Sequence, residues 1–531
     1  MASGYVSSKI RRISCTRSPE AASFATLDDI LARYPLSLLL LALLAYGAAV
    51  AGTFHLDDAS LFVNPGVTSP AGIIHLWAPL ATRPLTYSTF WLTYQLAGAN
   101  PLPYLITGLA LHLAVVWLLF LTLRRALPLN AAWLAAALFA VHPIQAEAVN
   151  YVFERATLLA ALFCLLSLRA WLDNAPWAAA AWFIPALLAK EECVAFPLFL
   201  ALLGLAGKGP KRAWTQLASM LALATAAGLR AMLAASRIAG AGAGASAAYS
   251  PEKYLAAQGP VIWRYVRLLV LPFGFTIDPD VRVPTPTLAV AAWLALTAAA
   301  SVALLAALRG WQPGWWLLGG LVLLLPSSSI FPASDLAADR RMYLPMIAFS
   351  AAFGLIAQRL DWRLAAALAA LLAGLALNRT LVWHSEQTLW QDAVAKAPTK
   401  LRPRIQLARA LPPSQAISLL DETHTLFPND PRVPAELGRI YLAQGDAPHA
   451  LAAFGVALAE SPADPLAYNN RGAALAALGQ NEAARADFNR ALSLNPCEFN
   501  ALLNLRRLGD PRPIPPHCRF TPLELHQLQG N

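Results

Sequence analysis

Two adjacent carboxylates, Asp57 and Asp58, directly follow the first strongly apolar segment, in the stretch FHLDDASLFVNP. Acids in this position are costly, because desolvation and mutual repulsion both disfavour their charged forms. One interpretation is catalytic: one carboxylate acts as a general base and its neighbour helps to orient an acceptor hydroxyl. The alternative is structural, with both acids ending a helix or turn and Asp58 capping a short helix. Composition alone favours the structural alternative.

Several basic residues fall in segments that we expect on the outer side of a membrane. Some adjoin acids, as in Glu154-Arg155 and Lys190-Glu191. A guanidinium group binds phosphate through two parallel hydrogen bonds, so these residues suit an anionic lipid headgroup. The alternative is that they form structural ion pairs or extend towards the membrane interface. The basic residues in question are Arg83, Arg155, Lys190, Arg264, Arg267, Arg340 and Arg341.

Other site types have no support in the sequence. His75, His112 and His142 do not share a metal-ligand spacing, and the five cysteines form no Cys-x-x-Cys motif. Phosphate-binding loops, dinucleotide fingerprints and nucleophile motifs are absent as well. We therefore expect no metal site and no cofactor. His142-Pro143 is expected to end the third apolar span.

The composition indicates the elements that must position these residues. Only 13% of the 531 residues are charged and 57% are hydrophobic. Charged residues number 8 in residues 1–33, 36 in residues 34–395 and 26 in residues 396–531, so the middle part is membrane-like and the last part resembles a soluble domain. This pattern excludes a single soluble enzyme, a disordered chain and a coiled coil.

The middle part is expected to form a multi-spanning helical bundle. A spanning helix needs about 20 apolar residues. Segment 260–275 carries two arginines and is expected to lie at the interface as an amphipathic helix. The eleven predicted spans are 35–54, 102–123, 131–145, 156–172, 177–189, 193–207, 213–235, 287–308, 314–332, 343–358 and 362–380.

Basic loops set the expected orientation. Loops rich in Lys and Arg stay on the cytoplasmic side. This rule places the N-terminal segment 1–33 inside, and the large loop 55–101 and the domain 396–531 outside. The net charge of +10 is then explained by the membrane surface rather than by a nucleic-acid partner. The Ala/Leu/Arg-rich composition suggests a bacterial source, in which the outside is the periplasm.

The last part contains a repeat with a period of 34 residues, at 431–464 and 465–498. This is the tetratricopeptide pattern, and it predicts a C-terminal α-solenoid. Small residues let the paired helices approach, and the aromatic fills the gap between repeats. A degenerate unit ends at Pro428, and 499–508 is expected to be a capping helix. The positions in register are Gly438/Gly472, Gly445/Gly479, Ala450/Ala484, Phe454/Phe488, Ala457/Ala491 and Pro462/Pro496.

Four of the five cysteines divide into two groups. Cys164 and Cys193 lie in apolar segments and are expected to be small core residues. Cys497 and Cys518 both lie in the C-terminal domain. If that domain faces an oxidising compartment, these two could form a disulfide.

The order of the motifs resembles a known family. After FHLDDASLFVNP come TRPLTYSTFWLTYQLAGANPLPYLITGLALH, FAVHPIQAEAVNYVFERATLLAALF, LLAKEECVAFPL, YVRLLVLPFGFTID and FPASDLAADRRMYLP, and then the repeats. From about residue 34 onwards the chain resembles the transmembrane and tetratricopeptide repeat-containing O-mannosyltransferases. These are multi-spanning glycosyltransferases of the GT-C class that use lipid-phosphate sugars.

The resemblance implies roles for particular residues. Asp57 would be the catalytic base, with Asp58 as its neighbour. Where many relatives carry an acid two residues after the second-loop arginine this chain has Thr157, and where they often have Glu before the arginine pair it has Asp339. The implied donor-phosphate and substrate-binding residues are Arg83, Glu147, Glu154, Arg155, Lys190, Asp339, Arg340 and Arg341.

Three functions remain open at this point. The first is transfer of mannose or another hexose from a polyprenyl-phosphate donor to protein Ser/Thr hydroxyls by an inverting mechanism. The repeats would then help to recruit the protein acceptor. The second is the same chemistry on a glycan or lipid acceptor, and the third is a non-enzymatic membrane scaffold for envelope assembly. The sequence does not name the sugar, the acceptor or the oligomeric state.

Overall fold

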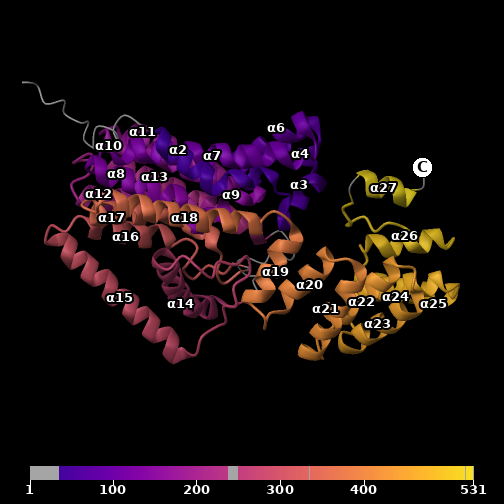
Figure 1. Cartoon of the computed structure of the whole chain (residues 1–531). Coiled ribbons are helices and arrows are strands. Elements are labelled where there is room, and N and C mark those ends of the chain that lie inside the picture. The colour runs from indigo at the N-terminus through magenta and orange to yellow at the C-terminus, as the bar shows by residue number, and fades with distance from the viewer. Residues whose placement is uncertain (1–34, 237–248, 334, 521, 530–531) are drawn as a thin grey trace, which may run out of the picture.

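The chain is all-helical over the residues that the computed structural model describes, which are 35–236, 249–333, 335–520 and 522–529 (Figure 1). No β-strand occurs among these residues. The all-α prediction is therefore confirmed for this part of the chain. The predicted cytoplasmic segment 1–33 lies outside the described residues.

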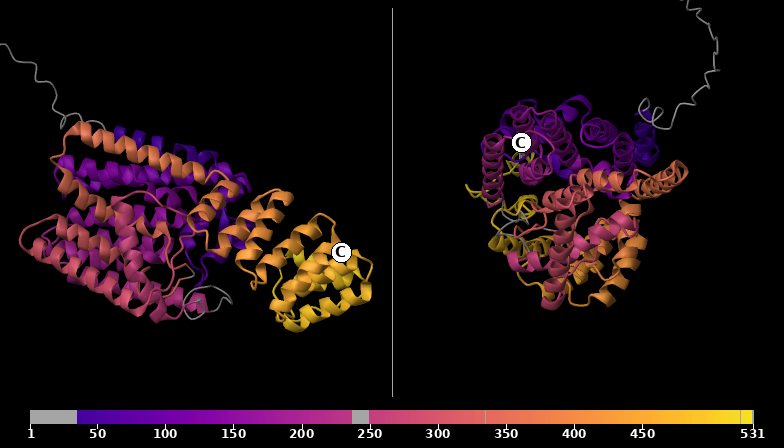
Figure 2. Two further views of the ribbon diagram at one scale, coloured as in Figure 1. Left: turned by 60° about the horizontal axis from the view of Figure 1, so that its bottom comes forward. Right: turned by 90° about the vertical axis from the view of Figure 1, so that its left-hand side faces the viewer.

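Apolar helices of different lengths pack side by side into one bundle with a continuous apolar core (Figures 1 and 2). The first half of the bundle comprises α2 (Leu36–Tyr46), α7 (Pro101–Leu123), α8 (Leu129–Val141), α10 (Arg155–Leu172), α11 (Pro176–Ala189), α12 (Phe196–Leu205) and α13 (Trp214–Ser236). The second half comprises α14 (Pro251–Val270), α15 (Pro286–Leu308), α16 (Pro313–Leu324), α17 (Pro345–Ala357) and α18 (Trp362–Val382).

The helices that suit a membrane by length and composition number five among the described residues, or up to seven if two bent pairs each count as one span. The expectation of eleven spans is therefore not confirmed. Three predicted spans form the short helices α11, α16 and α17, of 12 to 14 residues. At 1.5 Å per residue these helices reach only about 18 to 21 Å, against a hydrocarbon thickness of about 30 Å.

One end of the bundle is built from broken helices. α2 continues as the 3₁₀ turn η1 (Gly47–Ala51) and then bends by 53° into the segment that carries Asp57. α8 ends at Val141, and the His142 side chain accepts a hydrogen bond from the N–H of Ile144, so His142-Pro143 ends this helix as predicted. Short elements fill this end: η2 (Leu56–Ala59), α3 (Ser60–Val63), α4 (Pro65–Thr68), η3 (Pro70–Gly72), α5 (Ile73–Leu76), α6 (Pro84–Ala97), η4 (Pro143–Gln145), α9 (Ala146–Asn150), η5 (Val152–Glu154), η6 (Glu191–Ala195) and η8 (Asp339–Met342).

The segment expected at the interface, 260–275, is part of a longer helix. α14 begins at Pro251, runs through Pro260 and ends at Val270. Its buried face includes Tyr254 and Tyr265, and the helix packs against α15. α14 is not among the helices that suit a membrane span, which agrees with leaving it out of the predicted spans.

The C-terminal residues form a solenoid of helix pairs that projects from the end of the bundle where α3 to α6 lie (Figures 1 and 2). The predicted repeats correspond to α22 with α23 and to α24 with α25. The degenerate unit corresponds to α20 with α21, and the capping helix to α26. The helices are α19 (Glu386–Lys396), α20 (Leu401–Ala410), α21 (Pro413–Leu426), α22 (Arg432–Ala443), α23 (Ala447–Glu460), α24 (Pro465–Ala477), α25 (Asn481–Leu494), α26 (Phe499–Arg507) and α27 (Pro522–Gln529).

The small residues of the repeat allow close helix packing. A Cβ atom on Gly438 would lie 2.8 Å from the ring of Phe454, and one on Gly472 would lie 2.7 Å from the ring of Phe488. Each phenylalanine therefore packs against the glycine of its own repeat. Phe454 also contacts Ala474 of the next repeat, so its ring fills the space within its repeat and the space between the two repeats.

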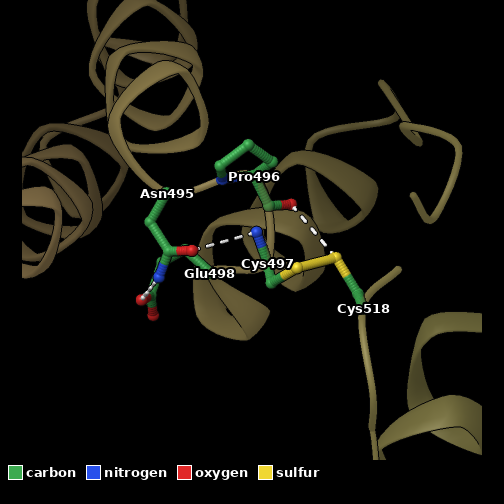
Figure 3. Close-up of a disulfide and its surroundings, with 5 residues drawn as sticks. All are labelled: Asn495, Pro496, Cys497, Glu498 and Cys518. Atoms are coloured by element: carbon green, nitrogen blue, oxygen red, sulfur yellow. Dashed lines mark hydrogen bonds between the residues drawn. A yellow bond between two sulfur atoms is a disulfide. The ribbon is translucent and has the colours of Figure 1, made fainter. Parts of the chain in front are cut away.

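A disulfide closes the end of the solenoid (Figure 3). Cys497 and Cys518 are bonded, with their Cα atoms 5.4 Å apart. The Cys497 N–H donates to the Asn495 side chain over 3.1 Å, which fixes the turn before α26. The possible pairing is thus present, and Cys164 and Cys193 are free and buried as predicted.

Candidate active site

Asp57 is an exposed carboxylate held by a buried tyrosine. It lies in η2, and Tyr151 lies between α9 and η5. The Asp57 N–H donates to the Tyr151 hydroxyl over 3.1 Å, and this hydroxyl donates to Asp57 Oδ2, also over 3.1 Å. The phenol fixes one carboxylate oxygen, while the side chain stays open to a ligand.

The backbone is strained at two points of this region. Leu56 has a φ of 48° and Arg83 a φ of 50°. Side chains with a Cβ atom rarely adopt this left-handed conformation, which costs about 1–3 kcal/mol and is concentrated at functional sites. The two strained residues lie next to Asp57 and at the start of α6, respectively.

Asp58 has a different environment from Asp57, because it is completely buried. Its carboxylate accepts from the N–H groups of His55 and Phe153, over 2.9 and 2.8 Å. His55 is itself fixed by Glu386 Oε1, 2.6 Å from Nδ1. Asp58 therefore caps η2 and connects it to η5. Capping of a short helix is the role that the structural alternative gave to this residue.

Arg83 forms a bidentate ion pair with Glu191 in η6. Its Nε donates to Oε2 over 2.9 Å, and its Nη2 donates to Oε1. Burial disfavours the charged carboxylate, but the charge and hydrogen bonds of Arg83 lower the pKa of Glu191 to about 2. The Arg83 Nη1 group makes no hydrogen bond to the described residues, so it remains available to an anion.

A cavity of about 540 Å³ lies beside Arg83. Tyr87 lies in its wall. Burial raises the pKa of the Tyr87 phenol, while Arg83 lowers it and Glu191 and Asp57 raise it. The volume is in the usual range for small-ligand sites. The other lining residues are Asn64, Pro65, Gly66, His75, Leu76, Leu80, Ala81, Thr82 and Ala234.

Lys190 and Glu154 form the first part of a buried ion-pair network. The Lys190 ammonium donates to Glu154 Oε2 over 2.8 Å and to Thr157 Oγ1 over 2.7 Å. The Thr157 hydroxyl in turn donates to Glu154. Lys190 also lies 3.0 Å from Glu192 Oε2. The hydroxyl of Thr157 thus stands where the family resemblance implies an acid.

Arg340 joins Glu154 to Glu147. Its Nε lies 3.0 Å from Glu154 Oε1, its backbone N–H donates to Glu147 Oε2 over 3.0 Å, and its Nη1 donates to Glu147 Oε1. The Nη2 group lies 3.4 Å from Asp335 Oδ2. Three carboxylates therefore surround this one guanidinium group.

The neighbours of Arg340 connect the same segment to α14. Arg264 donates to Asp339 Oδ1 over 2.6 Å. Arg341 donates to the Tyr254 hydroxyl over 3.2 Å and to the Asp335 carbonyl over 2.7 Å. Asp339 and Arg341 therefore hold η8 in place, and both are at least nine-tenths buried.

Arg155 occupies a separate environment. It is 1% exposed, and its guanidinium stacks on Phe90, 4.5 Å from the ring centroid. Its hydrogen bonds go to Thr93 and to the carbonyls of Thr89 and Tyr104. It makes no ion pair with a described residue. The structure thus brings together Asp57, Arg83, Glu147, Glu154, Lys190 and Arg340 at one end of the bundle, with Arg155 packed between α6 and α7.

Three residues of this region were not anticipated as site residues: Tyr151, Glu191 and Tyr87. Glu191 was visible as the neighbour of Lys190, but its pairing with Arg83 depends on how η6 lies against α6. Tyr151 stands between Glu147 and Glu154 in a stretch expected to form a turn. The only feature in the sequence that could have marked Tyr151 is its hydroxyl group between two acids. That feature does not show that Asp57 is its hydrogen-bond partner.

Curated relatives share sequence with part of this chain. Protein O-mannosyl-transferase Tmtc1 of Drosophila melanogaster is 34% identical over 165 residues, which are 27% of this chain and 19% of that protein. Protein O-mannosyl-transferase F38B6.6 of Caenorhabditis elegans is 32% identical over 152 residues, 25% of this chain and 22% of that protein. The family resemblance is confirmed.

The aligned parts are short. The human protein O-mannosyl-transferase TMTC1 is 35% identical over 141 residues, which are 16% of its own length. The tetratricopeptide repeat family model matches residues 465–496, within the second predicted repeat. A crystal structure of the APC/C hetero-tetramer Cut9–Hcn1 covers 91% of this chain at 14% identity, but its TM-score of 0.22 is too low to support an argument.

Proposed function

We propose that the chain is a membrane glycosyltransferase that moves a hexose, mannose by family resemblance, from a polyprenyl-phosphate donor to protein Ser/Thr hydroxyls on the extracytoplasmic face. The observation that carries the proposal is the position of Asp57. It is an exposed carboxylate fixed by Tyr151, and it lies at the same end of the bundle as a cavity whose wall includes Thr82, the neighbour of Arg83. The names of the partial-length relatives support the same reaction.

The proposed chemistry needs one base and one anion site. Asp57 takes the proton of the acceptor hydroxyl as the hydroxyl oxygen attacks the anomeric carbon. The bond between that carbon and the phosphate oxygen breaks, and the electron pair leaves with the polyprenyl phosphate. Attack from the face opposite the leaving group inverts the configuration. No further proton is needed, because the leaving phosphate is already anionic.

Arg83 is the residue best placed to hold the donor phosphate. It is partly exposed and adjoins Thr82 of the cavity wall, and its Nη1 group is available. Arg340 is surrounded by three carboxylates, so we assign it to holding Glu147 and Glu154 in position. An arginine fixed in advance stabilises charge that develops on the leaving group.

The solenoid is proposed to recruit the protein acceptor. Tetratricopeptide repeats present an extended concave surface. The solenoid lies at the Asp57 end of the bundle, and Glu386 of α19 contacts His55 directly. An acceptor held there is close to the proposed base. A glycan or lipid acceptor, and a purely structural membrane scaffold, are the alternatives that the experiment must separate.

The test compares glycopeptides from four cultures by mass spectrometry: cells lacking the chain, and the same cells with wild type, Asp57→Asn or Asp173→Asn at equal expression. Asp173 lies at the other end of the bundle and pairs with Arg125, so it is the matched control. We expect hexose on Ser/Thr peptides with wild type and Asp173→Asn only. An unchanged protein glycome would exclude a protein acceptor, and equal rescue of the deletion phenotype by Asp57→Asn would favour the scaffold.

A further inference from the structure

A second large cavity lies at the end of the bundle away from Asp57. α7 begins near this acid, where Tyr104 packs on Phe54 with ring centroids 5.4 Å apart. The helix then runs for 23 residues, or about 34 Å. The residues that follow it, 126–128, line the second cavity. The two sites are therefore separated by about the thickness of a membrane.

This cavity has a volume of about 710 Å³ and combines two chemical surfaces. Lys208, Gln312, Gln358 and Arg359 supply its polar wall. The Lys208 ammonium donates to the Ala126 carbonyl over 3.1 Å, which holds the charge at the wall. Arg359 makes no hydrogen bond to any residue that the structure describes. The remaining lining is mainly apolar: Leu127, Pro128, Gly310, Trp311, Pro313, Leu355 and Ile356.

The rim of the cavity is apolar and open. Ile356 is 59% exposed and Trp311 is 43% exposed. Both belong to the membrane-like part of the chain, and their apolar surface is left uncovered by the described residues. An occupant with an apolar tail would cover them, whereas a small water-soluble anion would leave them uncovered.

Charge at this end of the bundle is strongly one-sided. In the described loops and adjoining helix ends, the acids are Asp173, which pairs with Arg125 over 2.7 Å, and Asp361, which accepts from the Arg363 N–H over 2.9 Å. Neither lines the cavity. The basic residues are Arg124, Arg125, Arg169, Lys208, Lys211, Arg212, Arg309, Arg359 and Arg363.

We propose that this cavity binds the phosphate headgroup of an anionic glycerophospholipid. Lys208 and Arg359 hold the phosphate oxygens, because charge-assisted hydrogen bonds to phosphate are the strong ones. Trp311 and Ile356 contact the first carbons of the acyl chains. Basic pockets between transmembrane helices recognise anionic headgroups in this way. The site is independent of sugar transfer, because it lies across the bundle from Asp57.

The test measures lipid binding by the full-length protein in a neutral detergent. Phosphatidylglycerol, phosphatidylcholine and sn-glycerol 1-phosphate are added separately, and apparent Tm and native mass spectra are recorded. We expect phosphatidylglycerol to raise the apparent Tm and to remain bound in the mass spectrum. In Lys208→Gln/Arg359→Gln its apparent affinity should fall at least about tenfold, since two charged hydrogen bonds are lost.

Two further variants control for folding and for general charge. Arg359→Gln alone removes an exposed side chain without a hydrogen-bond partner in the described structure, so it should fold normally and still weaken binding. Arg363→Gln removes a nearby charge that stacks on Trp362, 5.6 Å from the ring, and does not line the cavity. It should bind as wild type does. Equal stabilisation of wild type and the Lys208/Arg359 variants would overturn the proposal, as would equal effects of all three additives.

Discussion

Among the acids at the proposed active site, accessibility distinguishes Asp57. Glu147 and Glu154 are 4% exposed, and both are bound by Arg340. Asp58 is completely buried and its two oxygens accept from backbone N–H groups. A general base must come within hydrogen-bond reach of the proton that it removes. Asp57 alone in this group combines an exposed carboxylate with a fixed orientation.

Tyr151→Phe should test whether that orientation matters. The substitution removes the hydroxyl that donates to Asp57 Oδ2 and keeps the ring. A hydrogen bond to a charged group contributes about 1.5–3 kcal/mol, so we expect transfer activity to fall at least about tenfold, with apparent Tm little changed. Tyr441→Phe in the solenoid is the matched control. Activity that is unchanged in Tyr151→Phe would remove this tyrosine from the site.

Glu191→Gln should change how stability depends on pH. The folded pKa of Glu191 is about 2, below the ordinary value of 4.5, because Arg83 pairs with the carboxylate despite its burial. A carboxyl group whose pKa is lower in the folded state than in the unfolded state stabilises the folded protein. This stabilisation is complete above about pH 4.5 and is lost as the pH falls towards 2, where the carboxylate becomes protonated. Wild type should therefore have the higher apparent Tm at pH 7, and the difference from Glu191→Gln should shrink below pH 4.5. A difference that stays constant to pH 3 would contradict the ion pair.

The sequence marked Asp57 and its neighbours as candidate site residues, but it did not show which residues they contact. The acids and arginines stood out because charges are costly in an apolar chain. Whether Arg340 faces a phosphate or three carboxylates depends on how η8 packs against α9 and η5, which are distant in sequence. For the same reason, Asp57 and Asp58 were treated as a pair, although the structure exposes one and buries the other.

At the scale of elements, the repeat was predicted well because its spacing encodes a packing rule. Gly472→Ala should show this directly, since the new Cβ would lie 2.7 Å from the Phe488 ring. Overpacking of this kind costs about 1–3 kcal/mol. We expect faster hydrogen exchange in α24 and α25 of the full-length variant.

Gly455→Ala is the matched control for this glycine. Its Cβ would meet nothing within 4 Å, and alanine favours a helix interior by about 0.5–1 kcal/mol. Exchange in α23 should therefore stay the same or slow down. If both variants loosened the solenoid equally, close helix packing at Gly472 would not be the cause.

The membrane elements were predicted less well than the repeat. Hydropathy locates apolar segments but does not show where a helix breaks, so short helices such as α16 were counted as full spans. The predicted segment 260–275 starts at Pro260, yet α14 begins at Pro251 and continues through this proline. Contacts of α14 with α15 and η8 stabilise the helix around this proline. These contacts join segments that are distant in the sequence, so local sequence does not predict them.

At the scale of the whole molecule, charged contacts attach the solenoid to the bundle. Lys400 pairs with Asp278, and Arg402 lies 3.2 Å from Asp335 Oδ1. Asp335 also contacts Arg340 of the proposed site. Helix α20 of the solenoid is thus joined to the buried ion-pair network through Asp335. An acceptor bound to the solenoid would be held at a fixed distance from Asp57.

The disulfide permits a test of which side of the membrane the solenoid occupies. Disulfides persist in oxidising compartments, so the Cys497–Cys518 bond predicts an extracytoplasmic solenoid. In intact cells, a membrane-impermeant maleimide should label these two cysteines only after mild reduction. Cys497→Ser/Cys518→Ser should abolish that labelling, because Cys164 and Cys193 are buried and Cys15 belongs to the segment expected on the cytoplasmic side. It should also lower the stability of the closed segment by about 3 kcal/mol, the contribution of a loop of this size. Labelling of these two cysteines only after the cells are broken would place the solenoid in the cytoplasm and would remove the proposed acceptor route. Labelling of intact cells without reduction would contradict the disulfide but would still place the solenoid outside.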